Sequence, residues 1–104
     1  MARRGHQHDQ EYGLPLKPHW FHILLALSRN AQHGSGIVRS VFEETAGKLH
    51  LWPATLYGSL EELAVLGWIA EVTDAEERPA GSSDRQRFYR ITPAGVGLLA
   101  AEVD

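Results

Sequence analysis

Hydrophobic residues recur with helical spacing in three successive segments, residues 18–30, 37–47 and 53–67. In the first segment apolar side chains cover most of the helical cylinder, which is typical of a helix buried on more than one side. The other two segments carry a narrower apolar stripe, and they end at Gly47 and Gly67, residues that suit a helix stop. The pattern therefore predicts three helices with short connections.

The pattern changes after Gly67, where helical spacing gives way to short segments of another kind. Residues 68–72 and 85–91 contain aromatic and β-branched side chains, which favour strands. Residues 73–84 between them are rich in turn formers and acids and predict a loop. Thr92-Pro93 then offers an N-cap and a first-turn residue for a final short helix. The second half of the chain is thus predicted to form a two-stranded hairpin followed by a helix.

The first 17 residues show no sustained hydrophobic period, so we expect an N-terminal arm before a single domain over residues 18–104. The chain contains no cysteine, which excludes disulfides, thiolate zinc sites and cysteine nucleophiles. Its longest apolar runs fall far short of the roughly 18 residues that span a bilayer, and its start lacks a signal-peptide stretch. We therefore expect a soluble, cytoplasmic protein with no membrane partner.

The predicted order of three helices, a hairpin and a last helix is that of a winged helix-turn-helix, a mostly α fold with a two-stranded β-wing. Four short motifs narrow this further. In chain order they are His33-Gly34 followed by Ile37, Thr55-Leu56-Tyr57 with Leu60 and Leu63, Leu66-Gly67-Trp68-Ile69, and Phe88-Tyr89-Arg90-Ile91-Thr92-Pro93-Ala94-Gly95. They resemble the PadR family of transcriptional regulators, whose members carry a His-Gly turn, a Thr-Leu-Tyr recognition helix and a Tyr-Arg-Leu-Thr-x-x-Gly segment. The resemblance runs from about Leu24 to the C-terminus and implies a DNA-binding regulator rather than an enzyme.

Three features depart from the family pattern. Residues 52–54 are Trp-Pro-Ala where the family usually has Ser-Pro-Gly, and Gly58, Glu61 and Glu62 stand where it commonly has basic residues on the recognition helix. Family members also often continue into a long dimerisation helix, whereas this sequence ends at Asp104. These departures weaken the expected affinity for DNA and leave the dimer surface open.

The leucines at positions 56, 60 and 63 are predicted to face the core, and this determines which side chains of the third helix can reach DNA. Hydroxyls near a helix start can bond phosphate oxygens, and two arginines at positions i and i+2 of the second strand share one face beside the wing. The predicted DNA contacts are Lys48, Ala54, Thr55, Tyr57, Ser59, Arg85 and Arg87. The alternative for Tyr57 is packing against the wing, and the alternative for Thr55 is a local helix cap.

The charge of the chain opposes DNA binding. The formal net charge is −3, and Asp74, Glu76, Glu77 and Asp84 lie in the predicted wing loop. A local arginine strip can still act, because salt screens distant acids over about 8 to 10 Å. The same acids favour an alternative function, a winged-helix protein-interaction module without DNA binding.

Other chemistry has little support in the sequence. The pairs His6/His8 and His19/His22 have spacings that could hold a metal, but the first pair lies in the arm, and we expect neither a metal nor a cofactor. No nucleophile has an obvious base beside it, and no pair of carboxylates surrounds a pocket, so we expect no catalytic residues.

The expected partner is double-stranded DNA, bound by a homodimeric repressor on a near-palindromic operator with half-sites roughly 34 Å apart. The first helix with Trp20 and Phe21, the arm, and the last helix with Leu98 and Leu99 are the predicted dimer surfaces. The family resemblance also implies a small aromatic effector, whose site Trp20 or Trp52 could line. The simpler interpretation is that both tryptophans are packing residues.

Overall fold

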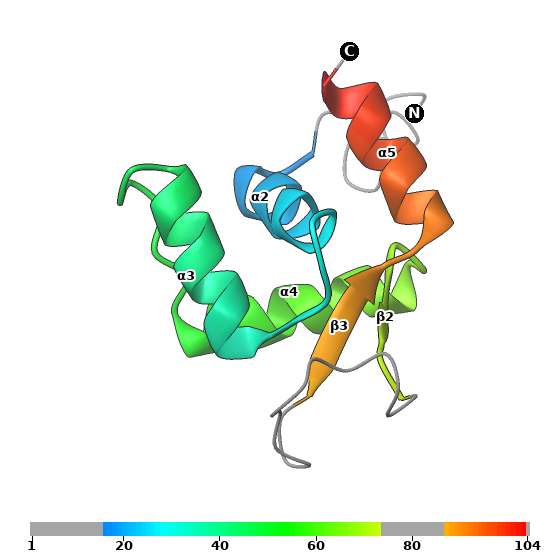
Figure 1. The fold of residues 1–104 in the computed structure, drawn as a ribbon, viewed down its shortest axis with the longest axis horizontal. Coiled ribbons are helices and arrows are strands. Elements are labelled where there is room, and N and C mark those ends of the chain that lie inside the picture. Colours follow the sequence, from blue (N-terminus) through cyan, green and yellow to red (C-terminus); the bar gives the residue numbers. More distant parts are fainter. Residues whose placement is uncertain (1–15, 74–86, 104) are drawn as a thin grey trace, which may run out of the picture.

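The computed structural model describes residues 16–73 and 87–103, and Figure 1 shows how their helices and strands are arranged. The elements in chain order are α2 (Pro18–Leu27), β1 (Gln32–His33), α3 (Gly34–Glu44), α4 (Pro53–Val65), β2 (Ile69–Glu71), β3 (Phe88–Ile91) and α5 (Pro93–Val103). All the predicted helices and both predicted wing strands are present. The fold is therefore a mostly α winged helix-turn-helix, with β2 and β3 as the two strands of the wing.

A third strand, which the sequence pattern did not indicate, joins the wing. The sheet is antiparallel with the order β1-β3-β2, and β1 pairs Gln32 with Tyr89 and His33 with Phe88. A strand of two residues is too short to leave an alternating pattern in the sequence, which explains why only two strands were predicted. Because β1 runs directly into α3, the sheet also fixes where α3 begins.

Helix α2 lies between α3 and α5 in Figure 1 and contacts both helices as well as β3. Its buried residues are Trp20, Ile23, Leu24, Ala26 and Leu27. Trp20 is 1% exposed and meets the ring of Trp68 edge-on, with 6.0 Å between centroids. The prediction of a first helix buried on more than one side is confirmed.

The helix boundaries follow local chemistry. α3 begins three residues earlier than predicted, because the Nδ1 atom of His33 accepts a hydrogen bond from the backbone N–H of Gly36 at 3.3 Å and so caps the helix. The last helical residue of α4 is Val65, and the predicted stop residue Gly67 follows the C-cap Leu66 with a φ of 83°. The N–H of Trp68 bonds the carbonyl of Leu63 at 3.0 Å, the pattern of a helix closed by a left-handed glycine.

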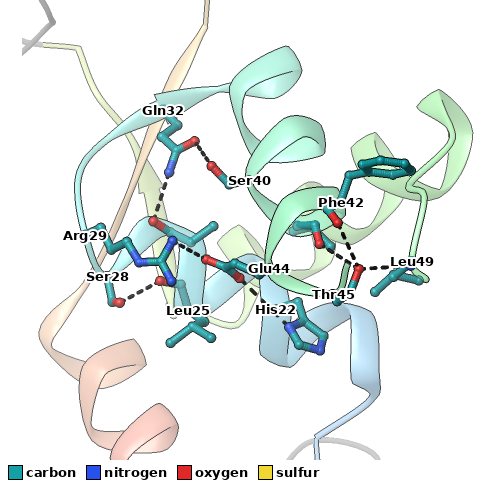
Figure 2. A network of polar contacts seen from close by, with 12 residues as sticks. His22, Leu25, Ser28, Arg29, Gln32, Ser40, Phe42, Glu44, Thr45 and Leu49 are labelled. Atoms are coloured by element: carbon teal, nitrogen blue, oxygen red, sulfur yellow. Dashed lines mark hydrogen bonds and ion pairs between the residues drawn. The ribbon is translucent and has the colours of Figure 1, made fainter. Parts of the chain in front are cut away.

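Polar side chains from the connection between α2 and α3 hold the two helices together (Figure 2). The amide of Gln32 donates to the carbonyl of Ala26 at 2.9 Å and accepts from the hydroxyl of Ser40 at 2.9 Å. At the other end of α3, the carboxylate of Glu44 is nine-tenths buried and contacts the guanidinium of Arg29. A buried carboxylate is costly without a countercharge, so this ion pair stabilises the placement of α3 against α2.

Helix α5 is fixed to the connection between α4 and β2. The hydroxyl of Thr92 accepts from the N–H of Gly95 at 3.1 Å, which confirms the predicted cap, and it donates to the carbonyl of Gly67 at 2.6 Å. A Cβ atom on Gly95 would lie 2.2 Å from the carbonyl oxygen of Trp68. The close approach of backbone to backbone at this point requires glycine.

We predict that Gly95→Ala destabilises the protein by about 3 kcal/mol or more, because the added methyl would overlap a backbone oxygen that cannot rotate away. Gly97→Ala in the same helix is the matched control, since nothing lies within 4 Å of its added Cβ. That variant should be more stable than the parent by about 0.5 to 1 kcal/mol. Urea unfolding followed by circular dichroism measures both, and equal midpoints for the two variants would contradict this packing.

Candidate nucleic-acid interface

The first turns of α3 and α4 border one surface cavity of about 360 Å³. It is lined by Gly34, Ser35, Val38, His50, Leu51, Trp52, Pro53, Leu56 and Tyr57. Neither helix has an acidic residue in its first turn, so no carboxylate there offsets the partial positive charge of the helix start. The arrangement suits anionic oxygens such as those of phosphate.

Most of the predicted contact residues on and before α4 are exposed, and Tyr57 also lines this cavity. Ala54, Thr55 and Tyr57 are exposed in the first turns of α4, and Lys48 is exposed in the connection that precedes it. Leu56, Leu60 and Leu63 are buried, as predicted. The sequence therefore predicted correctly that the leucine side of α4 is buried and that Ala54, Thr55 and Tyr57 are exposed, while their contact with DNA stays a prediction.

Ser59 does not belong to this open face. It is 4% exposed, and the sequence-based choice of Ser59 as a DNA contact is not supported by its position. Ser59 lies three residues after Leu56 and four before Leu63, so it falls inside the buried stripe rather than on its flank.

Tyr57 lies over the start of α3. Its side chain is 53% exposed, and a Cβ atom built on Gly34 would come 2.6 Å from the tyrosine hydroxyl. The ring also lines a second cavity, of about 410 Å³, between α4 and the wing. Tyr57 therefore stands between the two helix starts and the wing, with about half of its surface open to solvent.

The second cavity contains the one predicted wing arginine that the structure describes. Arg87 forms a two-point contact with Glu71, with Nε to Oε2 at 3.2 Å and Nη2 to Oε1 at 2.9 Å. This hydrogen bond raises the pKa of Arg87, which stays charged in either case. Both side chains are exposed to solvent, and such surface pairs contribute only about 0 to 1 kcal/mol. Arg87 can therefore exchange Glu71 for a phosphate at little cost.

The second predicted wing arginine, Arg85, lies outside the described residues, as do His6, His8 and the acids of the wing loop.

Of the two acids on α4, Glu61 lines the wing cavity. Burial lowers the pKa of His19, Lys17 lowers it further, and the charge of Glu62 opposes this. Glu62 therefore lies within electrostatic range of His19 on α2.

Two negative findings apply to residues 16–73 and 87–103. Their His, Asp and Glu side chains form no group of three that could hold a metal ion. None of the helices found there has both the length and the apolar character needed to cross a bilayer.

Trp52 is not the packing residue that the simpler interpretation expected. Trp20 is a buried packing residue, as the simpler interpretation held, but Trp52 is 67% exposed directly before α4. One side of its indole meets the ring of His50, with 4.2 Å between centroids, and His50 meets Phe42 at 6.0 Å. For the exposed rings of Phe42, His50 and Trp52, the only sequence signal was the departure from the family pattern at residues 52–54.

Comparison with known proteins agrees with the fold and the motifs. Residues 23–101 match the model of the transcriptional regulator PadR-like family. No protein with a curated description matches the sequence.

Several solved structures share the fold at low sequence identity. A transcriptional regulator from Clostridium thermocellum is 24% identical with a TM-score of 0.67, covering 82% of this chain and 76% of its own. RosR from H. salinarum is 20% identical with a TM-score of 0.68, covering 86% and 73%. BpsR from Bordetella bronchiseptica, whose DNA binding is regulated by 6-hydroxynicotinic acid, is 24% identical with a TM-score of 0.65, covering 98% and 68%. With a family match over most of its length and a winged helix-turn-helix fold, the chain belongs to the PadR-like family of transcriptional regulators.

Proposed function

We propose that the protein is a sequence-specific DNA-binding repressor that acts as a homodimer on a near-palindromic operator. In this proposal α4 enters the major groove and the wing follows the phosphate backbone. The observation that supports it best is the shared opening of the α3 and α4 first turns, with Thr55 and Tyr57 exposed beside it. Lys48 before α4 and Arg87 beside the wing supply exposed positive charge on either side.

Electrostatic attraction in this proposal is modest. The chain carries a formal charge of −3, and Glu71 competes with phosphate for Arg87. DNA binding must therefore rely on a few close contacts rather than on a broad basic surface, and each such contact should have a measurable share of the salt dependence.

The outward side of α5 supports a dimer. Its exposed residues are all apolar or small, namely Pro93, Ala94, Val96, Gly97, Ala100 and Ala101. Of the predicted dimer residues, Trp20 and Leu99 are buried in the core of the protomer and are unavailable to a partner, whereas Phe21 and Leu98 are partly exposed. We therefore assign the dimer surface to the exposed face of α5 together with the partly exposed side chains next to it.

The small aromatic effector stays a prediction. The cavity between the helix starts offers the rings of His50, Trp52 and Tyr57 to such a ligand, which would then compete with DNA. Titration of the tryptophan fluorescence with a panel of phenolic compounds tests it. Flat titrations would remove the effector from the proposal and leave DNA binding untouched.

The test of DNA binding is fluorescence anisotropy on the DNA upstream of the protein's own gene, against scrambled DNA, over a range of salt. Arg87→Ala and Lys48→Ala should each lower the slope of log affinity against log salt by about 0.9, the value for one phosphate contact. Glu71→Gln should raise affinity about two- to fivefold, because it releases Arg87 from a surface ion pair.

Lys17→Ala is the matched control for these variants. Lys17 lies over the Trp20 ring at 4.6 Å, beside Leu16, whose N–H donates to Glu102 near the end of α5. We expect no change in its salt slope. Specific binding that none of the cationic variants alters would refute this assignment of contacts. The lack of any DNA preference would instead favour the protein-interaction module.

A charge on α5 should dissociate the dimer. Val96 is 49% exposed on that helix, and Val96→Glu is expected to convert a dimer into a monomer at micromolar concentration, because burying the carboxylate in an apolar interface is unfavourable. Val65→Glu is the control, since Val65 is 81% exposed on α4. Analytical ultracentrifugation distinguishes the outcomes, and a parent protein that sediments as a monomer would rule out the homodimer.

A further inference from the structure

Trp52 combines a large apolar surface with an exposed position. Trp52 is 67% exposed and its ring contacts His50 on one side, so it lies outside the core. Such a surface is unfavourable in water, because covering exposed aromatic area lowers the free energy. The position of Trp52 therefore suggests a surface that a partner covers.

The place of Trp52 identifies that partner. The residue is the N-cap of α4 and lines the cavity between the α3 and α4 first turns, together with Ser35 and Tyr57. In helix-turn-helix proteins the first residues of the recognition helix are the ones that contact base edges. Trp52 is thus continuous with the proposed DNA interface, and DNA is the occupant that we assign to this cavity.

The composition of α4 limits how it can recognise a sequence. Residues 53–65 include no Arg, Lys, Asn or Gln, so the helix cannot make the two-point hydrogen bonds that distinguish guanine or adenine. The exposed hydroxyls of Thr55 and Tyr57 can bond either phosphates or bases and discriminate weakly. Strong discrimination must come from another kind of contact.

The apolar group that B-DNA presents in the major groove is the C5-methyl of thymine. We propose that Trp52 is a specificity-determining residue that packs against a thymine methyl in each half-site, so that the operator carries a fixed A·T pair opposite the start of α4. This inference rests on the proposed function, because it requires that α4 enter the major groove. In this proposal Trp52, an apolar residue at the N-cap of α4, discriminates between base pairs, rather than a polar side chain of the helix.

The test starts from the tightest-binding duplex selected from a random pool. Each thymine of the half-sites is replaced symmetrically by deoxyuridine, which removes only the methyl group. We expect one thymine position to lose about fourfold in affinity per half-site, the factor for exposing one buried methyl. In Trp52→Ala the overall affinity should fall and the effect of that one uracil should disappear.

Two further variants complete the experiment. Trp52→Phe keeps an apolar ring and should retain part of the uracil effect. Lys17→Ala, which lies outside both cavities, should leave the whole profile unchanged. A profile in which no uracil matters, or in which the same uracil matters equally in Trp52→Ala, would overturn the role of Trp52 while sequence-specific binding stands. If no duplex is preferred over random DNA, the proposed function fails and the inference fails with it.

Discussion

Burial of α2 constrains the rest of the molecule. The helix presents apolar side chains in several directions, and α3, α5 and β3 each cover part of its surface. Because close-packed side chains tolerate little displacement, covering one helix from three directions fixes the mutual positions of its neighbours. The angle between α3 and the elements that follow it is then set by the core. The relative position of the first turns of α3 and α4 follows from that packing.

The proposed interface combines weak electrostatics with an exposed aromatic side chain. Arg87 is paired with Glu71, Lys48 is a single exposed charge, and the acids of α4 lie beside the wing cavity or toward α2. The ring of Trp52, in contrast, is an exposed apolar surface that contacts His50 on one side. Such a surface would bind DNA less by long-range electrostatic attraction than by close fit. Its affinity would then depend more on the local shape of the DNA than on the ionic strength.

Local signals in the sequence predicted the helices and the wing strands well. Pro53, Gly67 and the Thr92-Pro93 pair mark real boundaries because each acts through its own backbone chemistry, which does not depend on distant residues. The strand at Gln32 could not be predicted, because its pairing partner lies more than fifty residues away.

The site was predicted less well than the fold, for reasons specific to each residue. Ser59 was misplaced because a polar side chain on the edge of a leucine stripe can fall on either side of the boundary. The contact between Glu71 at the end of β2 and Arg87 just before β3 has no sequence spacing that reveals it. The exposure of Trp52 also depends on tertiary context, since a tryptophan is more often part of a core.

The two-residue strand β1 has a mechanical consequence. His33 pairs with Phe88 of the wing and also caps α3 through its ring, so one residue belongs both to the sheet and to the helix start. Tilting the wing against α3 would break backbone hydrogen bonds of the sheet or the cap. The start of α3 and the wing are thereby coupled into one stiff unit. In the proposed homodimer, rotation of whole protomers against each other would therefore be the softer motion.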